Sequence, residues 1–296
     1  MKGVILINAY LNTEEYLHQP LRLREEFEKL GVVVDVKRND EFLRIEDGKV
    51  KTPLSEYDFC VYLDKDKYVL KGLDKLGLPL FNGMEGVLDC DDKMLTYLSL
   101  EGTGIPMPKT LAGLCCFSFK EEIKEGSLQR IEKELSYPIV VKESFGSLGQ
   151  GVYLVKDRID LLDLMNKLKC RPHLFQEYIS DSYGKDVRVI VVGNKVLGGM
   201  LRTSNGDFRS NLGAGGKGDK YELSVEMKEV ALKVAFALKL DYCGIDFLLK
   251  KDGNFVLCEV NSNAFFSGFE KVTGVNVAKE YAEYIIKKLQ KNNKNG

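Results

Sequence analysis

The chain has 296 residues, of which 44% are hydrophobic and 29% charged, a composition typical of a soluble globular protein with two or three domains. Lysine and arginine together number 43, and aspartate and glutamate 44, so the protein lacks the cationic surplus with which a general nucleic-acid binder displaces phosphate counterions. The apolar runs are far shorter than the ~20 residues of a membrane-spanning helix. We therefore expect neither nucleic acid nor a membrane as a partner.

The cysteines number 7 and show no Cys-x-x-Cys spacing. The sequence thus indicates neither a disulfide framework nor a zinc ribbon, and a reduced, cytoplasmic compartment fits best. The neighbours Cys115 and Cys116 are interpreted as small apolar residues beside Phe117 in a strand-like stretch, with a redox pair as the alternative.

Residues 1–88 alternate strand and helix patterns. The apolar run 4–7 predicts a buried first strand and ends too early for a signal peptide. A helical pattern over 14–30 closes at Gly31, and a shorter one ends near Leu76. This alternation predicts an α/β domain with a small parallel sheet and covering helices. Its further strands are expected at 32–36, 59–63 and 78–81.

Proline and glycine residues between Gly83 and Pro108 mark a change of organisation after this domain. An acidic helix start is expected at 89–92, followed by Lys93 in the opening turns. Further helices are expected at 120–135, 159–168 and 224–240, and strands at 139–141, 152–155, 187–192, 196–201, 244–249 and 255–261.

A glycine-rich turn joins two of these strands. Lys142 ends the first strand, and Gly146, Gly149 and Gly151 follow it. Glycines let backbone N–H groups wrap an anion, and a lysine supplies a point charge for phosphate. The turn is not a Walker A loop, because no Lys-Ser or Lys-Thr follows the last glycine and a strand comes next. A plain hairpin connection with glycines for turn geometry is the alternative.

A second glycine cluster, residues 213–218, formally matches Gly-x-Gly-x-x-Gly. That pattern belongs to a tight strand-to-helix turn, whereas the next helix begins only near Ser224, so a dehydrogenase is not expected. The cluster is interpreted as a mobile loop that folds over a bound anion beside Arg209 and Asn211. An exposed loop without function is the alternative.

A predicted hairpin near the C-terminus is the most informative pattern. Residues 252–253 read Asp-Gly, a signal for a two-residue type I′ turn. With this turn Lys251 pairs with Asn254, and counting outward sets Asp246 directly opposite Glu259. A one-residue bulge in the turn would undo this pairing.

Asp246, Glu259 and Asn261 share one face of that hairpin, because side chains alternate along a strand. Two carboxylates placed opposite each other repel, so a cation is expected between them. Oxygen ligands of this kind suit magnesium or manganese, particularly where phosphates complete the shell. A solvated face neutralised by lysines is the alternative, but the flanking residues are apolar and no cation stands between Glu259 and Asn261.

Basic residues elsewhere supply the complementary charge. The planar guanidinium suits carboxylate and phosphate oxygens, and Asp186 shares a strand face with Arg188. Histidine catalysis and a histidine zinc site are not expected, because the only histidines are His18 and His173 and no Gly-x-Ser-x-Gly motif accompanies them. The basic candidates are Lys93, Lys142, Arg188, Arg202 and Arg209.

Short motifs follow one another in a characteristic order from about residue 91 to 278. They are Val140-Val141-Lys142 with the glycine loop, Gln176-Glu177-Tyr178-Ile179, Asp186-Val187-Arg188, Phe208-Arg209-Ser210-Asn211-Leu212, and Glu259-Val260-Asn261 followed by Val272-Thr273-Gly274-Val275. In this order they resemble the ATP-grasp superfamily, in particular the RimK-like branch of ribosomal-protein-S6 modification enzymes and α-L-glutamate ligases. The resemblance implies an ATP-grasp fold of α/β and α+β class. An N-terminal pre-ATP-grasp domain (1–88) would precede two α+β lobes (89–178 and 179–296) that grip ATP.

The resemblance also implies ATP and two Mg²⁺ ions as cofactors, with Mn²⁺ able to substitute. Glu177 and Tyr178 would form the hinge that reads adenine, and Asp186 would approach the ribose. The implied nucleotide contacts are Lys93, Lys142, Gly146, Gly149, Gln176, Glu177, Tyr178, Ile179, Asp186, Arg188, Arg209, Ser210 and Asn211. The implied metal ligands are Asp246, Glu259 and Asn261, the implied substrate contacts are Arg202, Arg209 and Asn263, and the implied catalytic residues are Lys142 and Arg209.

The implied activity is an ADP-forming ligase that joins a carboxylate to an amine through an acyl phosphate. Its partners would be ATP, an amino acid or other amine such as glutamate, and a peptide, protein or small-molecule carboxylate. After Asn261 the bulky Phe265 and Phe266 replace the Ser-Pro-Gly type turn of glutamate-adding relatives, so both substrates stay open. The oligomeric state stays open too, and a homo-oligomer is compatible with the sequence. The alternative function is a catalytically silent, ATP-binding regulatory module.

Overall fold

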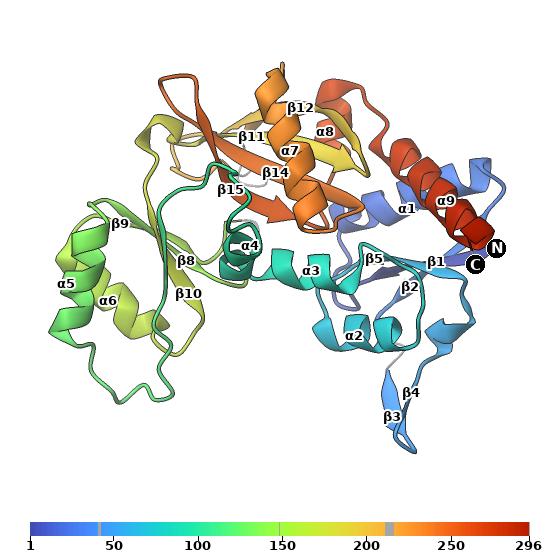
Figure 1. Ribbon diagram of the computed structural model, residues 1–296, viewed down its shortest axis with the longest axis horizontal. Helices are drawn as coiled ribbons and strands as arrows, with labels where there is room; N and C mark the ends of the chain where they lie inside the picture. The colour runs from blue at the N-terminus through green and yellow to red at the C-terminus, as the bar shows by residue number, and fades with distance from the viewer. Residues whose placement is uncertain (41–42, 148, 211–215, 296) are drawn as a thin grey trace.

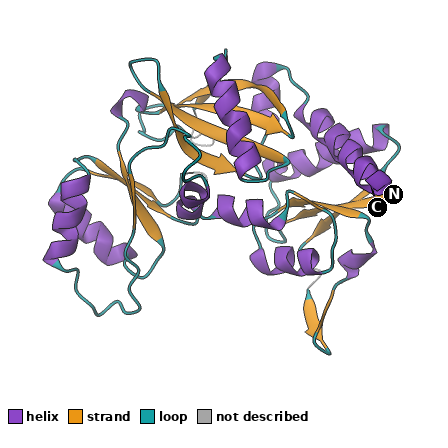
Figure 2. Ribbon diagram, viewed as in Figure 1, coloured by secondary structure: helices purple, strands orange, loops and turns teal. Residues whose placement is uncertain are grey.

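The computed structural model describes residues 1–40, 43–147, 149–210 and 216–295. These residues form three units, each built on one main sheet (Figure 1). Helices flank all three sheets (Figure 2). No helix in the described ranges is long and apolar enough to cross a membrane.

The N-terminal domain contains a parallel four-stranded sheet. Its elements are β1 (Lys2–Ile7), α1 (Glu14–Lys29), β2 (Val33–Arg38), β3 (Arg44–Glu46), β4 (Lys49–Lys51), β5 (Phe59–Leu63), α2 (Lys67–Lys75) and β6 (Leu80–Phe81). The sheet order is β2-β1-β5-β6, and β3 and β4 form a separate hairpin that projects from the domain (Figure 1). Strands β1 and β5 are buried because both faces of a parallel sheet are covered. The predicted parallel α/β arrangement is confirmed.

Two short helices, α3 (Met84–Asp91) and α4 (Lys93–Ser99), follow this domain. The prediction of a helix start at 89–92 is wrong for residues 89–91, which end α3. Only Asp92 begins a helix. Its carboxylate accepts hydrogen bonds from the backbone N–H groups of Met94 (2.8 Å) and Leu95 (3.2 Å), as an N-cap does.

The central lobe is an antiparallel sheet with helices beside it. Its elements are β7 (Thr110–Ala112), α5 (Glu125–Glu134), β8 (Ile139–Glu143), β9 (Val152–Val155), α6 (Arg158–Leu168) and β10 (His173–Glu177), in the sheet order β7-β10-β8-β9. The helix predicted over 120–135 begins later, because the Glu121 N–H donates to the Ser118 carbonyl (3.4 Å) in a turn ahead of it. The strand-like stretch expected around Cys115 is also wrong: Cys115 and Phe117 are solvent-exposed loop residues.

The C-terminal lobe is a second antiparallel sheet. Its elements are β11 (Lys185–Val192), β12 (Lys195–Thr203), β13 (Lys217–Tyr221), α7 (Val225–Ala237), β14 (Tyr242–Leu249), β15 (Phe255–Asn261), α8 (Ser267–Thr273) and α9 (Val277–Asn295), in the sheet order β13-β12-β11-β14-β15. Helix α7 crosses one face of this sheet, and α9 lies beside α1 of the N-terminal domain (Figure 1).

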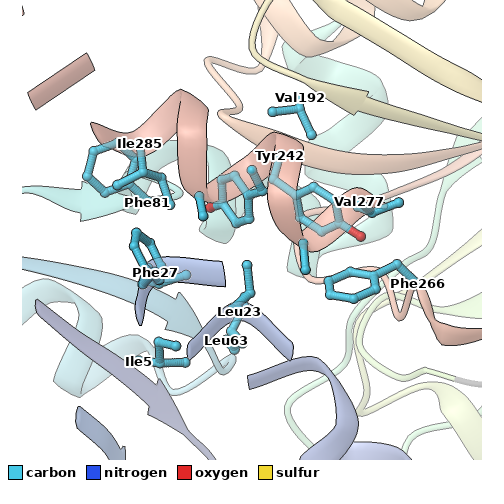
Figure 3. Packing of buried hydrophobic residues seen from close by; sticks show 14 of the residues in the cluster. Ile5, Leu23, Phe27, Leu63, Phe81, Val192, Tyr242, Phe266, Val277 and Ile285 are labelled. Carbon is cyan, nitrogen blue, oxygen red and sulfur yellow. The ribbon is translucent and has the colours of Figure 1, made fainter. Parts of the chain in front are cut away.

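One hydrophobic core joins the N-terminal domain to the C-terminal lobe. Ile5 and Phe27 of the domain belong to the same buried cluster as Tyr242 and Ile285 of the lobe (Figure 3). A second cluster packs Cys90, Leu100 and Ile105 against the C-terminal lobe. Each predicted domain range contains one of the three main sheets. The exact boundaries at residues 88 and 178 stay predictions, because the shared core packs the N-terminal domain directly against the C-terminal lobe.

The C-terminal hairpin reaches its predicted pairing by an unpredicted route. The two-residue turn is wrong: the Lys250 N–H donates to the Asn254 carbonyl (2.8 Å), which leaves a three-residue connection and shifts the register by one. A bulge at Cys258 then shifts it back. Asp246 consequently faces Glu259, as predicted, because two displacements of one residue cancel.

Candidate active site

A cleft lies between the central and C-terminal lobes, and residues of both lobes line it. Strand β8 and its glycine loop form one side, β11, β12, β14 and β15 form the other, and the segment after β10 crosses between the lobes. The predicted site residues that line it are Lys93, Lys142, Gly146, Gly149, Gln176, Glu177, Tyr178, Ile179, Asp186, Arg202, Arg209, Ser210, Asp246 and Glu259.

Two buried lysines reach this cleft from opposite directions. Lys93, the first residue of α4, donates to the Gly146 carbonyl (3.0 Å) and lies 3.9 Å from the Glu259 carboxylate. Burial lowers the pKa of Lys93, against the attraction of Glu259. Lys142, in β8, lies 3.5 Å from the Cys258 carbonyl at the bulge. Both ammonium groups therefore stand where strand β15 meets the glycine loop.

The glycine loop adopts conformations that require glycine. Gly149 has φ +75° and Gly151 φ +71°, a left-handed region that other residues rarely enter. Arg209 donates to the Gly149 carbonyl (2.9 Å) and is held by Asp207 (2.7 Å). The loop of the central lobe and the arginine of the C-terminal lobe thus meet across the cleft. Leu148 lies outside the described residues.

A buried charge cluster forms the floor of the cleft. Arg202 donates to both oxygens of Asp186 (2.7 and 2.5 Å) and to Asp246 (2.8 Å). Arg188 makes a bidentate pair with Asp246 (2.8 and 2.7 Å), and Ser210 donates to Asp186. Burial disfavours the ionised form of Asp246, but the attraction of Arg188 and then Arg202 outweighs it and lowers the pKa of this carboxyl.

A second cavity lies between the C-terminal lobe and the N-terminal domain. Its volume is about 410 Å³, within the range of sites that bind small molecules. Ser147, Arg202 and Glu259 line both this cavity and the cleft, so the two spaces share a wall. Its other charged and polar lining residues include Asn8, Glu15, Gln19, Asp64, Lys65, Arg188, Asn261 and Asn263.

Part of the wall of this second cavity is formed by contacts between the two units on either side of it. Gln19 of α1 donates to the Asn263 side chain (3.3 Å), and Tyr16 meets Phe265 edge-on with ring centroids 4.9 Å apart. Both pairs join α1 to the segment after β15. The bulky Phe265 therefore forms part of this wall.

The N-terminal wall of the cavity is held by its own domain. Arg38 donates to the carbonyls of Asn8 (3.0 Å), Ala9 (3.1 Å) and Leu11 (2.9 Å), which fixes the loop after β1. Asp64, directly after β5, accepts from the Asn8 side chain (3.1 Å), and burial raises its pKa. These hydrogen bonds hold the loop to its own domain.

The residues predicted for a metal fit Mg²⁺ in their chemistry. Glu259 lines both cavities and lies 3.9 Å from the Lys93 ammonium. Among the described residues the buried Asn261 Nδ2 has no hydrogen-bond acceptor, and the amide would offer a metal its oxygen. Within the described ranges no cluster of three or more His, Cys, Asp or Glu side chains is arranged for a metal. The proposed metal ligands therefore remain Asp246, Glu259 and Asn261. To bind a metal, Asp246 would have to loosen its contacts with Arg188 and Arg202.

Several predicted residues lie in unexpected places. Arg188, expected at the nucleotide, lines the second cavity. Arg209, expected both along the nucleotide phosphates and at the reacting carboxylate, lines the cleft and not the second cavity. Asp186, expected near the ribose, has its carboxylate occupied by Arg202 and Ser210. Asn211 and residues 213–215 of the second glycine cluster lie outside the described residues.

The N-terminal lining of the second cavity was missed in the sequence. Asn8 and Asp64 directly follow β1 and β5, and the carboxyl ends of parallel strands are where such sheets bind ligands, so that rule could have found them. Tyr16 and Gln19 lie inside a helix and carry no such signal.

The comparisons with known proteins agree with this geometry. The RimK-like ATP-grasp domain family matches residues 90–285. N-acetylaspartylglutamate synthase A of Homo sapiens is 37% identical over 262 residues, which cover 88% of this chain and 64% of that protein. Beta-citrylglutamate synthase B of Danio rerio is 39% identical over 231 residues, which cover 77% of this chain and 56% of that protein. The chain thus spans less than two thirds of the length of these curated relatives.

The fold itself matches solved ATP-grasp structures. D-alanine–D-alanine ligase from Bacillus anthracis, crystallised with ATP, superposes with a TM-score of 0.73 at 19% sequence identity and covers 100% of this chain and 99% of that one. The expected ATP-grasp fold is confirmed.

Proposed function

The chain belongs to the RimK-like ATP-grasp family, and we propose from this membership that it is an ADP-forming ligase that joins a carboxylate to an amine. The observation that carries the proposal is the wall shared by the two cavities. Ser147, Arg202 and Glu259 line both spaces. A phosphoryl group at the end of a nucleotide in the cleft would therefore stand next to a carboxylate in the second cavity.

The proposed reaction has two steps. A carboxylate oxygen of the acceptor attacks the γ-phosphorus of ATP, and ADP leaves, which forms an acyl phosphate. The amine nitrogen then attacks the acyl carbon, inorganic phosphate leaves, and the nitrogen loses a proton as the amide forms. Neither step needs a nucleophile from the enzyme, which agrees with a cleft lined by charged groups and backbone.

The lysines and arginines would carry out the electrostatic part of this reaction. Lys93 and Lys142 reach the cleft from two sides, and Arg209 stands beside the glycine loop, so all three could offset charge on the phosphates. Asp246, Glu259 and Asn261 would hold two Mg²⁺ ions, with Mn²⁺ able to replace them. When bound, Mg²⁺ neutralises phosphate charge.

For the substrates we propose glutamate as the amine and a small polycarboxylate as the acceptor. The two relatives are named for amides of glutamate with citrate and with N-acetylaspartate. The second cavity has a volume of about 410 Å³ and is lined in part by the packed rings of Tyr16 and Phe265, a size that favours a small molecule over a protein. Arg188 and Lys65 supply positive charge along its wall.

A cytoplasmic location is part of the same proposal. All seven cysteines are free thiols, and ATP is the substrate. This agrees with a reduced compartment.

The test is a substrate panel with direct product detection. The protein is incubated with MgATP, glutamate and, one at a time, citrate, N-acetylaspartate or a peptide that ends in glutamate. We expect ADP release that requires both substrates, together with a mass that corresponds to the amide, for one of the two small acceptors. ATP binding without ADP or amide in any reaction would favour the regulatory module, and a product formed only with the peptide would overturn the small-molecule assignment.

A further inference from the structure

Asn82, the residue that follows β6, is a buried amide with every hydrogen-bonding position used. Its side chain is 1% exposed. Its Nδ2 donates to the backbone carbonyls of Tyr242 and Ser262, both at 2.7 Å, and its Oδ1 accepts from the N–H groups of Asp241 (2.6 Å) and Tyr242 (2.9 Å). Two donors and two acceptor positions are all that an amide has, and backbone partners determine which end is oxygen.

These four bonds connect the N-terminal domain to both strands of the C-terminal hairpin. Direct pairing of β14 with β15 extends to Gly244 and Asn261 and goes no further. Tyr242 lies just beyond that pair on one strand, and Ser262 just beyond it on the other. The Asn82 side chain therefore lies between the strands where their own ladder stops, and bonds to each as a neighbouring peptide group would.

The hairpin carries the three residues proposed to bind metal, and they are not held equally. Asp246 is held by two arginines. Among the described residues the buried side-chain nitrogen of Asn261 has no hydrogen-bond acceptor, so the orientation of this amide depends largely on its backbone. That backbone continues directly into Ser262, whose carbonyl Asn82 holds.

We propose that Asn82 is a positioning residue for the metal site: it keeps Asn261 in place relative to Asp246 and Glu259 by bonding the ends of both strands. The inference rests on the proposed function, because it takes these three residues as the metal ligands. It also makes the N-terminal domain, which supplies the wall of the acceptor cavity, a support of the metal site.

The test compares variants of Asn82 with a matched amide elsewhere in the same interface. Asn82→Ala removes all four bonds. Asn82→Asp keeps the acceptors for Asp241 and Tyr242 but cannot donate to Ser262 as a carboxylate. Asn276 is the control, because its side chain also joins the two units, through Arg22 (3.2 Å) and Glu26 (3.0 Å), and lines neither of the two cavities.

The readouts are the affinity of the ADP-bound protein for Mn²⁺, followed by electron paramagnetic resonance, the affinity for ADP without metal, and the melting temperature. Both Asn82 variants should lose Mn²⁺ affinity by about tenfold or more, as when groups that orient a metal ligand are removed. Metal-free ADP affinity should stay at the wild-type value. Asn276→Ala should lower the melting temperature and keep wild-type Mn²⁺ affinity.

Wild-type Mn²⁺ affinity in Asn82→Asp, or an equal loss in Asn276→Ala, would overturn the positioning role. If Asn82→Ala does not fold, Asn82→Asp and Asn82→Gln carry the comparison, since each retains part of the bonding. A wild-type protein that binds Mn²⁺ with ADP but makes no amide would defeat the ligase proposal alone, and the variants would still decide the role of Asn82. A wild-type ADP complex that binds no Mn²⁺ would overturn both.

Discussion

The two cavities of this protein share a wall but differ in how they are built. The cleft proposed to bind the nucleotide (the nucleotide cleft) lies between two antiparallel lobes, and its lining consists largely of motif residues such as Lys142 and Gly149. The second cavity, proposed to bind the acceptor (the acceptor cavity), lies against a parallel sheet and takes part of its wall from the N-terminal domain, through residues such as Asn8 and Tyr16. Phosphate binding restricts the residue types that can line the nucleotide cleft. The lining of the acceptor cavity depends instead on which side chains the N-terminal domain places there.

The difference extends to how each wall is held. At the cleft, Lys93 and Arg209 donate hydrogen bonds to carbonyls of the glycine loop. A bound phosphate would compete with these carbonyls for the same donors. In the acceptor cavity, the loop after β1 is instead held by hydrogen bonds from Arg38 to its carbonyls. We therefore expect nucleotide binding to rearrange the contacts of the cleft and acceptor binding to leave its cavity wall as it is.

The largest effect is expected at the shared wall, from Glu259→Ala. This carboxylate faces both spaces and is proposed to hold metal, so its loss should lower the rate of amide formation about a thousandfold. Steady-state ADP release and product mass measure it. Glu177→Ala, in the hinge, serves as control and should change mainly the KM for ATP. Near-normal turnover in Glu259→Ala would contradict the proposal that Glu259 connects the two cavities in catalysis.

The buried charge cluster beneath both cavities should dominate stability. Arg202→Met leaves the buried Asp186 with only Ser210 and the buried Asp246 with only Arg188 among their present partners, and should reduce the free energy of unfolding by about 3 kcal/mol or more. Urea denaturation measures it. Arg188→Met should cost less, because Asp246 keeps Arg202. Equal losses in the two variants would show that the cluster is not organised around Arg202.

Low pH should affect the two cavities differently, because residues of α1 line the acceptor cavity and not the nucleotide cleft. Burial opposes ionisation of Glu26 in α1, but hydrogen bonds from Asn276, Lys29 and Arg22 outweigh it and lower its pKa to about 2. A lowered folded-state pKa stabilises the protein above the unfolded-state value of about 4.3 and loses that contribution as pH falls towards the folded-state value.

The expected loss from this carboxylate is about 2 kcal/mol between roughly pH 6 and pH 3. Denaturation at a series of pH values measures it, and Glu26→Gln is the control that should lack this component. Identical pH profiles for the two proteins would contradict the assignment. As the interface loosens, the KM for the acceptor should rise before that for ATP.

A smaller effect is expected at the outer wall of the acceptor cavity. Phe265→Ala removes the edge-on contact with Tyr16, and should raise the KM for the acceptor by about five- to tenfold, the value of one aromatic pair. The KM for ATP should not change. Phe208→Ala is the matched control, because Phe208 lines the cleft and its ring contacts Arg209; it should raise the KM for ATP and leave that for the acceptor unchanged. A rise in both KM values in either variant would show that the spaces are not independent.

The parallel α/β arrangement of the N-terminal domain and many of the residues that line the cleft could be predicted, because each depends on residues close together in the chain. The facing pair of Asp246 and Glu259 was predicted from the wrong turn. The register is restored by the bulge at Cys258, whose carbonyl accepts from Tyr97 (2.8 Å) in α4. That bond spans more than half of the chain, and no local pattern contains it.

The sequence by itself determined the order of the ATP-grasp motifs, the position of the glycine loop and the acidic residues of the C-terminal hairpin, because motif order, glycine placement and strand alternation are local properties. Only the tertiary structure decided the arginine contacts of Asp246, the role of Asn82 and the wall of the acceptor cavity. Each arises where two separately formed units meet, and which side chains meet there depends on how the shared hydrophobic core packs.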